Sequence, residues 1–433
     1  MTHSSFTRRE FLHRAALAGT GIAAVSAAPK LLLAAPRSPN EKLNIGVVGV
    51  AAQGAYNLGN VATENIVALC DIDEQRLGVA AEKFPAAKKY ADYRRMLDQP
   101  DLDAVVVATP DHSHAIPVVW ALKRGLDVYC EKPLAHSVYE VRQIRDWAAR
   151  KKAVTQMGTQ IHAGDNYRRV VELVQAGALG KINRVHVWKD GDSRIGNGKR
   201  VKDGTPPSYV DYDLWIGPAP MRPFDASHFH FNWRYWWDFG GGTLGDFGCH
   251  FMDLPFWALG LRYPTSVEAK GEITYTGDND VPDNMQVDYQ FPARGDQPPV
   301  QLTWYHGKWR PEGAEAYGKA NAVLFEGERG RLLADYGTHK LFLEPGISAD
   351  TPPQTIPASI GHHQEWIQAC KTRGETTCNF DYSGALAEAV LLGNVSYRAG
   401  GKRLDWDAER LKATNCPEAD NFLQREYRPG WTL

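Results

Sequence analysis

The sequence predicts an α/β protein with an N-terminal doubly wound parallel sheet, followed by a C-terminal α/β domain with a large, mostly antiparallel sheet. Between residues 43 and 157, short apolar runs alternate with amphipathic stretches, which is typical of β-α-β units. After about residue 165, apolar residues recur at every second position, which favours antiparallel strands. The length of 433 residues is long for one core, so two domains are expected.

Five apolar runs in the first part are predicted strands: 43–48, 66–70, 104–108, 126–130 and 153–157. Three stretches between them have helical spacing: 74–83, 114–123 and 138–151. The middle strands are nearly continuous in Val, Ala and Ile, as strands covered on both faces require. This alternation predicts a Rossmann dinucleotide-binding domain over residues 41–165 with right-handed crossovers.

The second part predicts a substrate-binding and oligomerisation domain over residues 166–380. It contains a helix, a Gly/Pro-rich aromatic region and several alternating segments: 167–176, 190–245, 266–276, 284–291, 300–306 and 320–326. A last helix at 382–400 ends at Gly400-Gly401, a C-cap signal. Residues 381–433 are expected to pack back on the first domain.

The N-terminus differs from the rest of the chain. Arg8 and Arg9 precede Phe11 and Leu12, and an Ala/Gly-rich run extends to Ala28. This order resembles a twin-arginine export signal, the alternative being a disordered basic tail. Residues 1–40 are therefore expected to be a signal peptide and linker, and the protein to be periplasmic or extracellular.

Composition restricts the partners. The net charge of −2 gives no reason to expect nucleic acid, and no apolar run after the leader is long enough for a transmembrane helix. The sequence contains no HExxH motif, no cysteine cluster and no evident two-His-one-carboxylate spacing, so no metal is expected. None of the six cysteines forms a CxxC pair. A Cys370–Cys378 bridge stays open.

The turn after the first strand resembles a dinucleotide-binding fingerprint. It reads GVAAQG, in which we expect five residues to bind a cofactor: Gly49, Ala51, Ala52, Gln53 and Gly54. Alanine stands in the second glycine slot, which puts the close approach of the backbone to a pyrophosphate in doubt. The alternative is a simple packing turn.

A carboxylate follows the second strand. Asp71 lies about 20 residues after Gly49, where such a residue takes the ribose hydroxyls and favours NAD over NADP. Arg76 could still reach a phosphate, which keeps NADP open.

Two later strands end in further candidate cofactor residues. Thr109 and Pro110 are expected at the carboxyl edge of the sheet, and His114 opens the next helix, where capping or packing also accounts for it. Glu131 and Lys132 follow the predicted strand at 126–130.

The Rossmann turn, the stretch ATPDHSH and the tripeptide EKP together resemble the Gfo/Idh/MocA family of NAD(P)-dependent sugar oxidoreductases. The resemblance runs from about Leu43 to the C-terminal helix. It implies that Lys132 sits beside the nicotinamide and hydrogen-bonds the substrate oxygen. It also implies that Glu131 and Pro133 shape the turn, with the peptide before the proline commonly cis.

A second signature, GGGTLGDFGCHFMD, spans residues 240–253. Asp246 and His250 are four apart and would share a helical face. The resemblance implies that Asp246 orients the substrate and that His250 is the general base, with Lys132 as the third catalytic residue. The chemistry fits, because hydride loss from an alcohol needs a proton acceptor and a cation near the developing alkoxide.

The remaining substrate candidates flank these residues. Gln160, after the predicted strand at 153–157, is expected to contact both cofactor and substrate. Aromatic faces suit sugar C–H surfaces, so Trp233, Tyr235 and Trp236 could form a platform, although core or oligomer contacts explain them equally well.

These observations predict an NAD-dependent oxidoreductase acting on a hydroxyl of a sugar, polyol or glycoside. Because the twin-arginine route carries folded proteins, the cofactor is expected to be tightly bound and recycled. A redox-assisted glycosidase, lyase or epimerase is one alternative, and a non-catalytic sugar-binding protein is another. The resemblance implies a homodimer or homotetramer formed through the open face of the second sheet.

Overall fold

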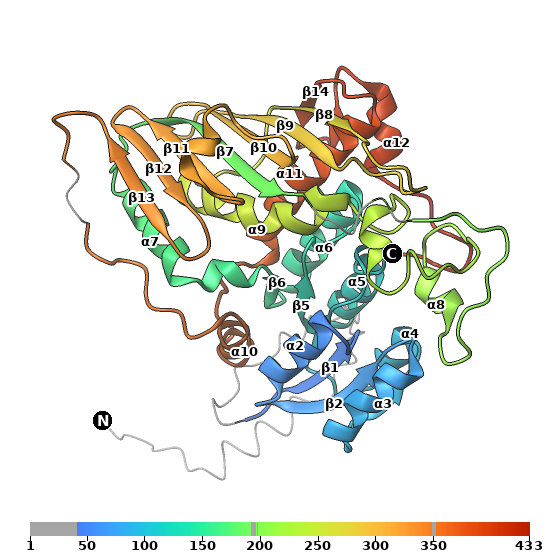
Figure 1. The fold of residues 1–433 in the computed structure, drawn as a ribbon. Coiled ribbons are helices and arrows are strands. Elements are labelled where there is room, and N and C mark those ends of the chain that lie inside the picture. The colour runs from blue at the N-terminus through green and yellow to red at the C-terminus, as the bar shows by residue number, and fades with distance from the viewer. Residues whose placement is uncertain (1–40, 192–195, 197, 349–351) are drawn as a thin grey trace, which may run out of the picture. The chain divides into compact units, whose positions relative to one another are not determined.

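The structure, a computed structural model, describes residues 41–191, 196, 198–348 and 352–433. Within 41–433 it contains a six-stranded sheet and a nine-stranded sheet with helices packed between and around them (Figure 1). The expected export signal lies outside the described residues. No helix among the described residues is both long enough and apolar enough to cross a membrane.

The first sheet has the order β3-β2-β1-β4-β5-β6, and all its neighbouring strands are parallel. Its strands are β1 (Asn44–Val48), β2 (Asn65–Cys70), β3 (Lys88–Tyr90), β4 (Ala104–Val107), β5 (Asp127–Glu131) and β6 (Thr155–Gly158). Its helices are α2 (Gln53–Val61), α3 (Glu74–Lys83), α4 (Tyr93–Met96), α5 (Ala115–Arg124) and α6 (Val138–Lys151). This confirms the doubly wound parallel sheet; only the short, polar β3 escaped the sequence pattern.

Local signals fix where two of these helices begin. Asp73 caps α3 by accepting hydrogen bonds from the amides of Gln75 and Arg76. Ser137 and Glu140 form a reciprocal capping box at the start of α6. Both helices therefore match their expected ranges.

The second sheet has the order β13-β12-β11-β7-β10-β9-β8-β14-β15. Its strands are β7 (Ile182–Asp190), β8 (Ser266–Glu272), β9 (Asn284–Phe291), β10 (Val300–Gly307), β11 (Ala322–Gly327), β12 (Gly330–Ala334), β13 (His339–Leu343), β14 (Leu404–Asp407) and β15 (Lys412–Ala413). β7 and β10 are parallel and the other pairs are antiparallel, so the sheet is mixed but mostly antiparallel, as expected.

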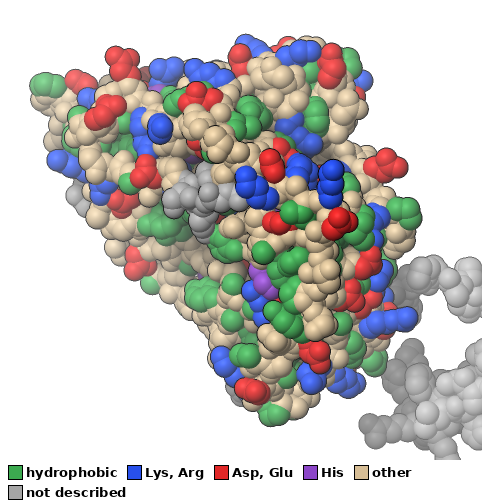
Figure 2. All heavy atoms as spheres, turned by 45° about the vertical axis from the view of Figure 1, so that its right-hand side comes forward, with side chains coloured by type: hydrophobic (Ala, Val, Ile, Leu, Met, Phe, Trp, Pro, Cys, Tyr) green, Lys and Arg blue, Asp and Glu red, His purple; other side chains and the backbone are tan. Residues whose placement is uncertain are grey.

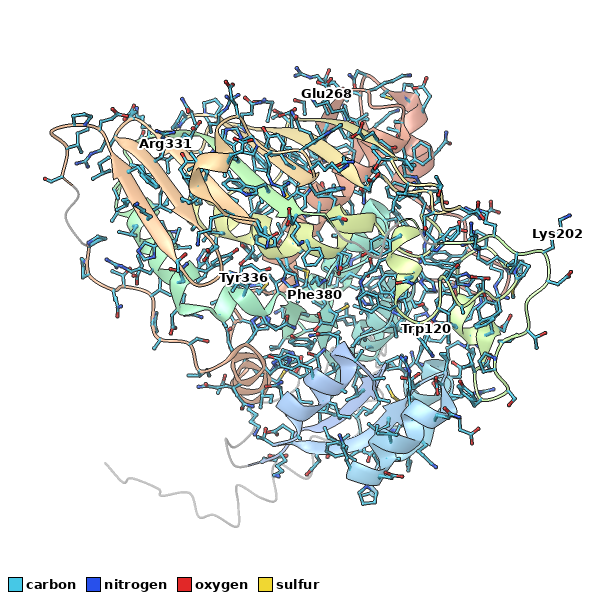
Figure 3. The ribbon with its side chains drawn as sticks, viewed as in Figure 1. Trp120, Lys202, Glu268, Arg331, Tyr336 and Phe380 are labelled. Carbon is cyan, nitrogen blue, oxygen red and sulfur yellow. The ribbon has the colours of Figure 1, made fainter. Side chains whose placement is uncertain are left out.

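Helices cover one face of the nine-stranded sheet. They are α7 (Asp165–Gln175), α9 (Gly242–Leu259) and α11 (Phe380–Arg398) (Figure 1). Along β8, Val267 and Ala269 are buried whereas Glu268 is exposed. Figure 3 shows Glu268 and Arg331 directed away from the helices. The period of two along β8 thus reports one covered and one exposed face. In the middle of the sheet the second face is also buried, by a cluster that includes Trp188, Tyr305 and Leu324.

The remaining helices are η1 (Asp111–Ser113), η2 (Gln160–Ala163), α8 (Tyr212–Ile216), η3 (Asn232–Tyr235), η4 (Ala314–Tyr317), α10 (His362–Thr372), η5 (Pro417–Ala419) and α12 (Asp420–Leu423).

The end of the chain returns to the first sheet. In α10, His363 Nε2 lies 2.9 Å from Asn57 Oδ1 of α2. Arg425 forms an ion pair with Glu140 of α6. Thus segments on both sides of residue 380 contact the Rossmann helices.

All six cysteines are buried and unbonded. Cys370 and Cys378, for which a bridge was left open, are both free thiols. The cysteines therefore behave as small apolar side chains in the core.

Candidate active site

A cavity lies at the carboxyl edge of the six-stranded sheet, where the turn after β1 forms one wall. Gly49 has φ 82°, and a Cβ at this position would lie 2.5 Å from the Ala108 carbonyl oxygen. A Cβ on Gly54 would lie 1.9 Å from the Gly49 carbonyl oxygen. Only glycine fits at either position, so this turn presents bare backbone to the cavity.

The unusual backbone conformation of this turn lies one residue after the position expected from the sequence. Ala52, not Ala51, has a positive φ, at 49° with ψ −115°, and it directly precedes α2. A non-glycine residue in this region stores local strain. Ala51, Ala52 and Gln53 all line the cavity, whereas Gly54 supports the turn from behind.

Asp71 lines the same cavity after β2. Its Oδ2 accepts a hydrogen bond from the Val50 amide at 3.0 Å, and its Oδ1 accepts one from the Asp73 amide at 3.1 Å. Burial raises the pKa of Asp71 from its ordinary value, although both amides oppose this shift. Arg76 also lines the cavity, beside Asp71.

Glu131 organises the other end of the cofactor edge. Its Oε1 accepts hydrogen bonds from Asn57 at 2.8 Å, Gln160 at 2.8 Å and Gln53 at 3.2 Å. A Cβ on Gly158 would lie 2.5 Å from the Glu131 carboxylate, so the neighbouring strand also leaves room for it. Burial raises the pKa of Glu131. This carboxylate therefore ties the β1 turn, α2 and the residue after β6 together.

His114 joins the two turns that face the cavity. Its Nδ1 lies 2.8 Å from the Pro133 carbonyl oxygen and its Nε2 lies 2.7 Å from the Thr109 carbonyl oxygen. Burial lowers its pKa to about 4, against the effect of both carbonyls. Thr109 and Pro110 line the cavity, and the Lys132–Pro133 peptide bond is cis.

Lys132 connects this edge to α9. Its Nζ donates to the Asp246 carboxylate and to the Asp246 backbone carbonyl, each at 2.6 Å. Arg234 Nε lies 3.2 Å from the same carboxylate oxygen. Burial alone would raise the pKa of Asp246, but the charges of Lys132 and Arg234 hold it below its ordinary value. Asp246 is thus an ionised carboxylate between two cations.

His250 lies one helical turn further along α9 and also lines the cavity. Burial and the nearby positive charge of Lys132 lower its pKa to about 3. Within the described part of the chain, its buried Nδ1 has no hydrogen-bond partner. The imidazole is therefore neutral at physiological pH and retains proton-accepting capacity.

The structure places the predicted aromatic residues in two different environments. Trp233 lines the cavity, but Tyr235 and Trp236 are fully buried and do not. Trp236 packs with Trp215, Phe239 and Trp233 itself in one apolar cluster. A stacking platform built from all three predicted rings is therefore wrong; only Trp233 is available to a ligand.

Residues 207–236, here called the covering segment, extend across the carboxyl edge. The Tyr209 carbonyl accepts from the Glu74 amide at 2.9 Å, and the Asp211 amide donates to the Ile72 carbonyl at 2.9 Å. His230 Nε2 lies 3.0 Å from Asp73 Oδ2. Several of its side chains line the cavity opposite the β1 turn: Leu214, Trp215, His230, Phe231, Trp233 and Arg234.

Sequence reasoning missed two charged residues of the cavity. Arg234 lies within the aromatic stretch and pairs with a helix that begins eight residues later in the chain. Asp111 is 4% exposed and lies inside the ATPDHSH stretch, whose fourth letter was not singled out. No regular spacing in the sequence connects either residue to Asp246. The only signal was that each residue lies close to a motif that the sequence analysis had singled out.

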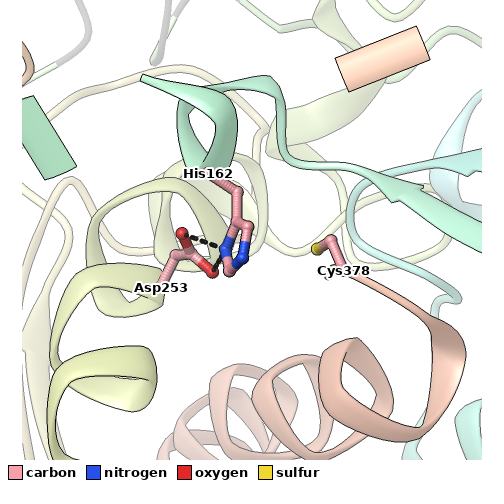
Figure 4. A group of neighbouring side chains, drawn as sticks. All are labelled: His162, Asp253 and Cys378. Carbon is pink, nitrogen blue, oxygen red and sulfur yellow. Dashed lines mark hydrogen bonds and ion pairs between the residues drawn. The ribbon is translucent and has the colours of Figure 1, made fainter. Parts of the chain in front are cut away.

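A buried cluster lies behind the catalytic face of α9. His162 Nδ1 lies 2.9 Å from each carboxylate oxygen of Asp253, and the Tyr382 hydroxyl donates to Asp253 at 2.7 Å. Cys378 lies beside them, and Figure 4 shows its sulfur on the far side of the imidazole from Asp253. These hydrogen bonds fasten α9 to η2 and to the start of α11.

Charged side chains of both signs are interspersed over the face of the molecule that Figure 2 presents. The same mixture follows from the near-neutral composition. The cavity differs from this surface, because it contains a largely buried ion pair between Lys132 and Asp246.

Two family models match the chain. Residues 43–159 match the oxidoreductase family's NAD-binding Rossmann fold, and residues 165–433 match its C-terminal alpha/beta domain. The chain belongs to the Gfo/Idh/MocA oxidoreductase family. Both the Rossmann domain and the NAD-binding character expected from the sequence are thereby confirmed.

Curated relatives match about a third of the chain. Myo-inositol 2-dehydrogenase of Thermotoga maritima is 28% identical over 142 residues, 32% of this chain and 42% of the relative. Inositol 2-dehydrogenase 1 of Saccharopolyspora erythraea is 32% identical over 150 residues, 33% of this chain and 44% of the relative. The matched stretch spans less than half the length of these relatives.

Solved structures share the fold over most of the chain. The WlbA dehydrogenase of Bordetella pertussis, in complex with NADH and UDP-GlcNAcA, has a TM-score of 0.62 at 18% identity and covers 85% of this chain and 99% of its own. Levoglucosan dehydrogenase in complex with NADH has a TM-score of 0.61 at 19% identity and covers 84% and 99%.

Proposed function

We propose that this protein transfers a hydride between a retained NAD cofactor and a hydroxyl group of a sugar, polyol or glycoside. One observation carries the proposal. Lys132, at the end of a Rossmann strand, is hydrogen-bonded to Asp246 of α9 in a cavity that His250 also lines. The carboxyl edge of the Rossmann sheet and the side chains proposed to manage the substrate proton therefore line the same cavity.

The residues present fit a dinucleotide. The turn packs so tightly that only glycine fits at Gly49 and Gly54, its residues Gly49, Ala51, Ala52 and Gln53 line the cavity, and Asp71 stands at the end of the next strand. When bound, NAD supplies hydride acceptance and donation. The turn would hold its pyrophosphate, Asp71 its ribose, and Glu131 with Gln160 would border the nicotinamide end.

The chain's own side chains would manage the proton. An ammonium group has three N–H donors, and two of those on Lys132 are directed at Asp246, which leaves the third for a substrate oxygen. That bond stabilises the alkoxide as it develops. Neutral His250 accepts the hydroxyl proton. Asp246, held by Lys132 and Arg234, is positioned to accept a second substrate hydroxyl.

The covering segment supports retention of the cofactor. Backbone bonds at Tyr209 and Asp211 fix it to the β2–α3 turn, and the chain's tail holds it from outside, because Arg428 donates to the Gly217 carbonyl at 3.1 Å. A ligand between this segment and the β1 turn is enclosed on two sides, which supports slow release.

Export by the twin-arginine route, to the periplasm or the cell exterior, is part of the proposal and rests on residues 7–28 of the sequence. A retained cofactor suits that location, since free NAD cannot be exchanged there. A fusion of residues 1–40 to a reporter that requires folded export tests it. Replacing both Arg8 and Arg9 with lysine should abolish export of the reporter. Unchanged export would contradict the assignment.

Assembly into a homodimer or homotetramer is also proposed. The supporting observation is the nine-stranded sheet, whose helices α7, α9 and α11 occupy one face (Figure 1). Light scattering should give a multiple of the 48.1 kDa chain mass, less any leader removed. A monomer would contradict this part of the proposal alone.

The activity is tested by mixing purified, NAD-loaded protein with myo-inositol, sorbitol, levoglucosan and methyl glycosides while following the absorbance of reduced nicotinamide. At least one compound should reduce the bound cofactor within minutes of mixing. Failure of every compound in both reaction directions would contradict the proposed function.

A further inference from the structure

Arg234 is a cation of the cavity with donors that the proposed reaction does not use. It lies in η3, within the covering segment, and its side chain is 19% exposed. Its Nε lies 3.2 Å from Asp246 Oδ1, and its Nη1 donates to the Phe231 carbonyl at 3.1 Å. No residue in the described part of the chain accepts a hydrogen bond from its Nη2. The N–H groups of Nη2 are therefore available to a ligand in the cavity.

Aromatic rings and the local backbone hold the guanidinium group of Arg234 in place. Its central carbon lies 4.3 Å from the ring centroid of Phe231 and 4.2 Å from that of Trp233, within the range of cation–π attraction. A Cβ at Gly240 would lie 2.7 Å from the Arg234 Cα, so these two stretches of backbone pack closely. Because the group is already ordered, it loses little conformational freedom when it binds a ligand. Arg234 is thus preorganised for binding.

The charges around Arg234 do not balance. Arg234 and Lys132 both contact the single carboxylate of Asp246, so these three groups carry one excess positive charge. Burial raises the pKa of nearby Asp111 to about 8 although the Arg234 cation opposes this shift, so Asp111 is largely protonated at neutral pH and does not cancel the excess. Glu131 is bound by three amide side chains at the cofactor edge. The substrate half of the cavity therefore favours an anionic ligand.

The two cations define where the groups of a substrate would lie. Lys132 Nζ and Arg234 Nε contact the same oxygen, Asp246 Oδ1, at 2.6 Å and 3.2 Å. The two nitrogen atoms are therefore no further apart than these two distances together, which is about the width of a sugar ring. One ring can thus present a hydroxyl to Lys132 and an anionic substituent to Arg234.

We propose that the substrate is a sugar acid of the uronate type, whose carboxylate is bound by Arg234 while Lys132 and His250 act on a ring hydroxyl. The inference rests on the proposed oxidoreductase function and names its substrate class. A carboxylate matches the planar donors of a guanidinium group. Its single negative charge also equals the local excess, whereas a phosphate ester would carry about two.

The reaction at the hydroxyl is the one already proposed. The ring carbon loses its hydride to the nicotinamide, the hydroxyl proton passes to His250, and the C–O single bond becomes double. The carboxylate makes and breaks no covalent bond. It contributes by fixing the ring, so that one hydroxyl and not its neighbours lies at Lys132.

The first test compares pairs of sugars that differ only in the group at C6. NAD-loaded protein is mixed with methyl glucuronide or methyl glucoside, galacturonate or galactose, and mannuronate or mannose, and the absorbance of reduced nicotinamide gives kcat/KM. In at least one pair the uronate should react on the order of 10- to 100-fold more efficiently, as expected for hydrogen bonds to a charged group. Glucose 6-phosphate is included as the phosphate-bearing competitor.

The second test asks whether Arg234 carries this preference. In Arg234→Gln the preference for the uronate should disappear, mainly through a higher KM for the uronate. Arg234→Lys keeps the charge but not the planar donors, so its preference should be intermediate. The matched control is Arg124→Gln, which removes an exposed arginine that also stacks on a ring and pairs with a carboxylate, and it should retain the wild-type preference. The NAD content should be the same in all variants.

Neutral sugars or glucose 6-phosphate that react as well as the uronates would overturn the substrate class and leave the oxidoreductase function intact. An unchanged preference in Arg234→Gln, or loss of NAD from this variant, would overturn the assigned role of Arg234. Calorimetric titration with the three uronates measures binding without reaction. Uronates that bind but never reduce the cofactor would contradict the proposed function alone, whereas absence of both binding and reaction would overturn both proposals.

Discussion

The cofactor half and the substrate half of the cavity depend on different structural features. The cofactor half consists mainly of backbone held by steric fit: Gly49 and Gly54 leave no room for a Cβ. The substrate half consists of charged side chains from separate elements, in which the cations of Lys132 and Arg234 both contact the carboxylate of Asp246. The first half depends on the absence of side-chain atoms, and the second depends on contacts between charged groups.

This difference predicts different responses to substitution. Damage to the backbone half should appear in stability and NAD binding together, because one turn serves both. Damage to the charged half should remove chemistry while NAD still binds, because the side chains contact α9 rather than the turn. The following predictions test that separation.

The largest effect is expected at Lys132. Lys132→Ala removes the cation beside the developing alkoxide, so hydride transfer should fall by at least a factor of about 10²–10³. NAD content measured after gel filtration should be unchanged. Lys202→Ala, at an exposed lysine (Figure 3), is the matched control and should behave as the wild type. Near-normal turnover of Lys132→Ala would contradict its assigned role.

Two glycine-to-alanine substitutions in α2 compare a position where a Cβ would clash with a position where a Cβ has room. Gly54→Ala forces a Cβ to 1.9 Å from the Gly49 carbonyl, which should cost on the order of 3 kcal/mol of unfolding free energy and abolish NAD binding. Gly59→Ala has nothing within 4 Å of its Cβ and should stabilise α2 by up to about 1 kcal/mol. Denaturant titration measures both; equal effects would refute the steric account.

Asp246→Asn should show the cost of unbalanced charge. It leaves Lys132 and Arg234 without a counter-ion, at an expected cost on the order of 3–5 kcal/mol at pH 7. Folding lowers the pKa of Asp246, so its stabilisation is present above the unfolded value of about 3.9 and is lost as the pH falls below it.

The stability difference between wild type and Asp246→Asn should therefore shrink below about pH 4. Asp98→Asn breaks an exposed pair with Arg124 and should cost less than about 1 kcal/mol at any pH. A difference that grows in acid would mean that Asp246 is protonated in the folded protein.

The smallest effect is expected at Ala52. Because this residue has φ 49°, Ala52→Gly should relieve strain and raise stability by about 1 kcal/mol. Ala51→Gly has no such strain to relieve and should be neutral or slightly destabilising, since glycine gains freedom in the unfolded chain. Thermal unfolding of the two variants side by side would show which alanine occupies the special slot.

Most of the first sheet was predictable because its signals are local. The caps at Asp73 and Ser137 adjoin their helices, and the buried strands are continuous apolar runs. β7 was missed because INRVHVWKD mixes buried and exposed positions without strict alternation. β13 was missed because His339–Leu343 is only partly covered and lies at the sheet edge.

The site shows the same limit. Lys132, Asp246 and His250 were found through motifs, and the structure brings them to one cavity. Arg234 and Asp111 were missed because their importance comes from their distance to Asp246, which only the folded chain defines. Tyr235 and Trp236 were misassigned because the sequence shows that a ring is present but not which way it faces.

The central claim, that this oxidoreductase keeps its nicotinamide, is tested most directly by measuring how much NAD or NADH the purified, extensively dialysed protein releases on denaturation. The account predicts close to one nicotinamide per chain. Protein that is empty after dialysis and takes up NAD only weakly would contradict it, because the covering segment would then not retain the cofactor.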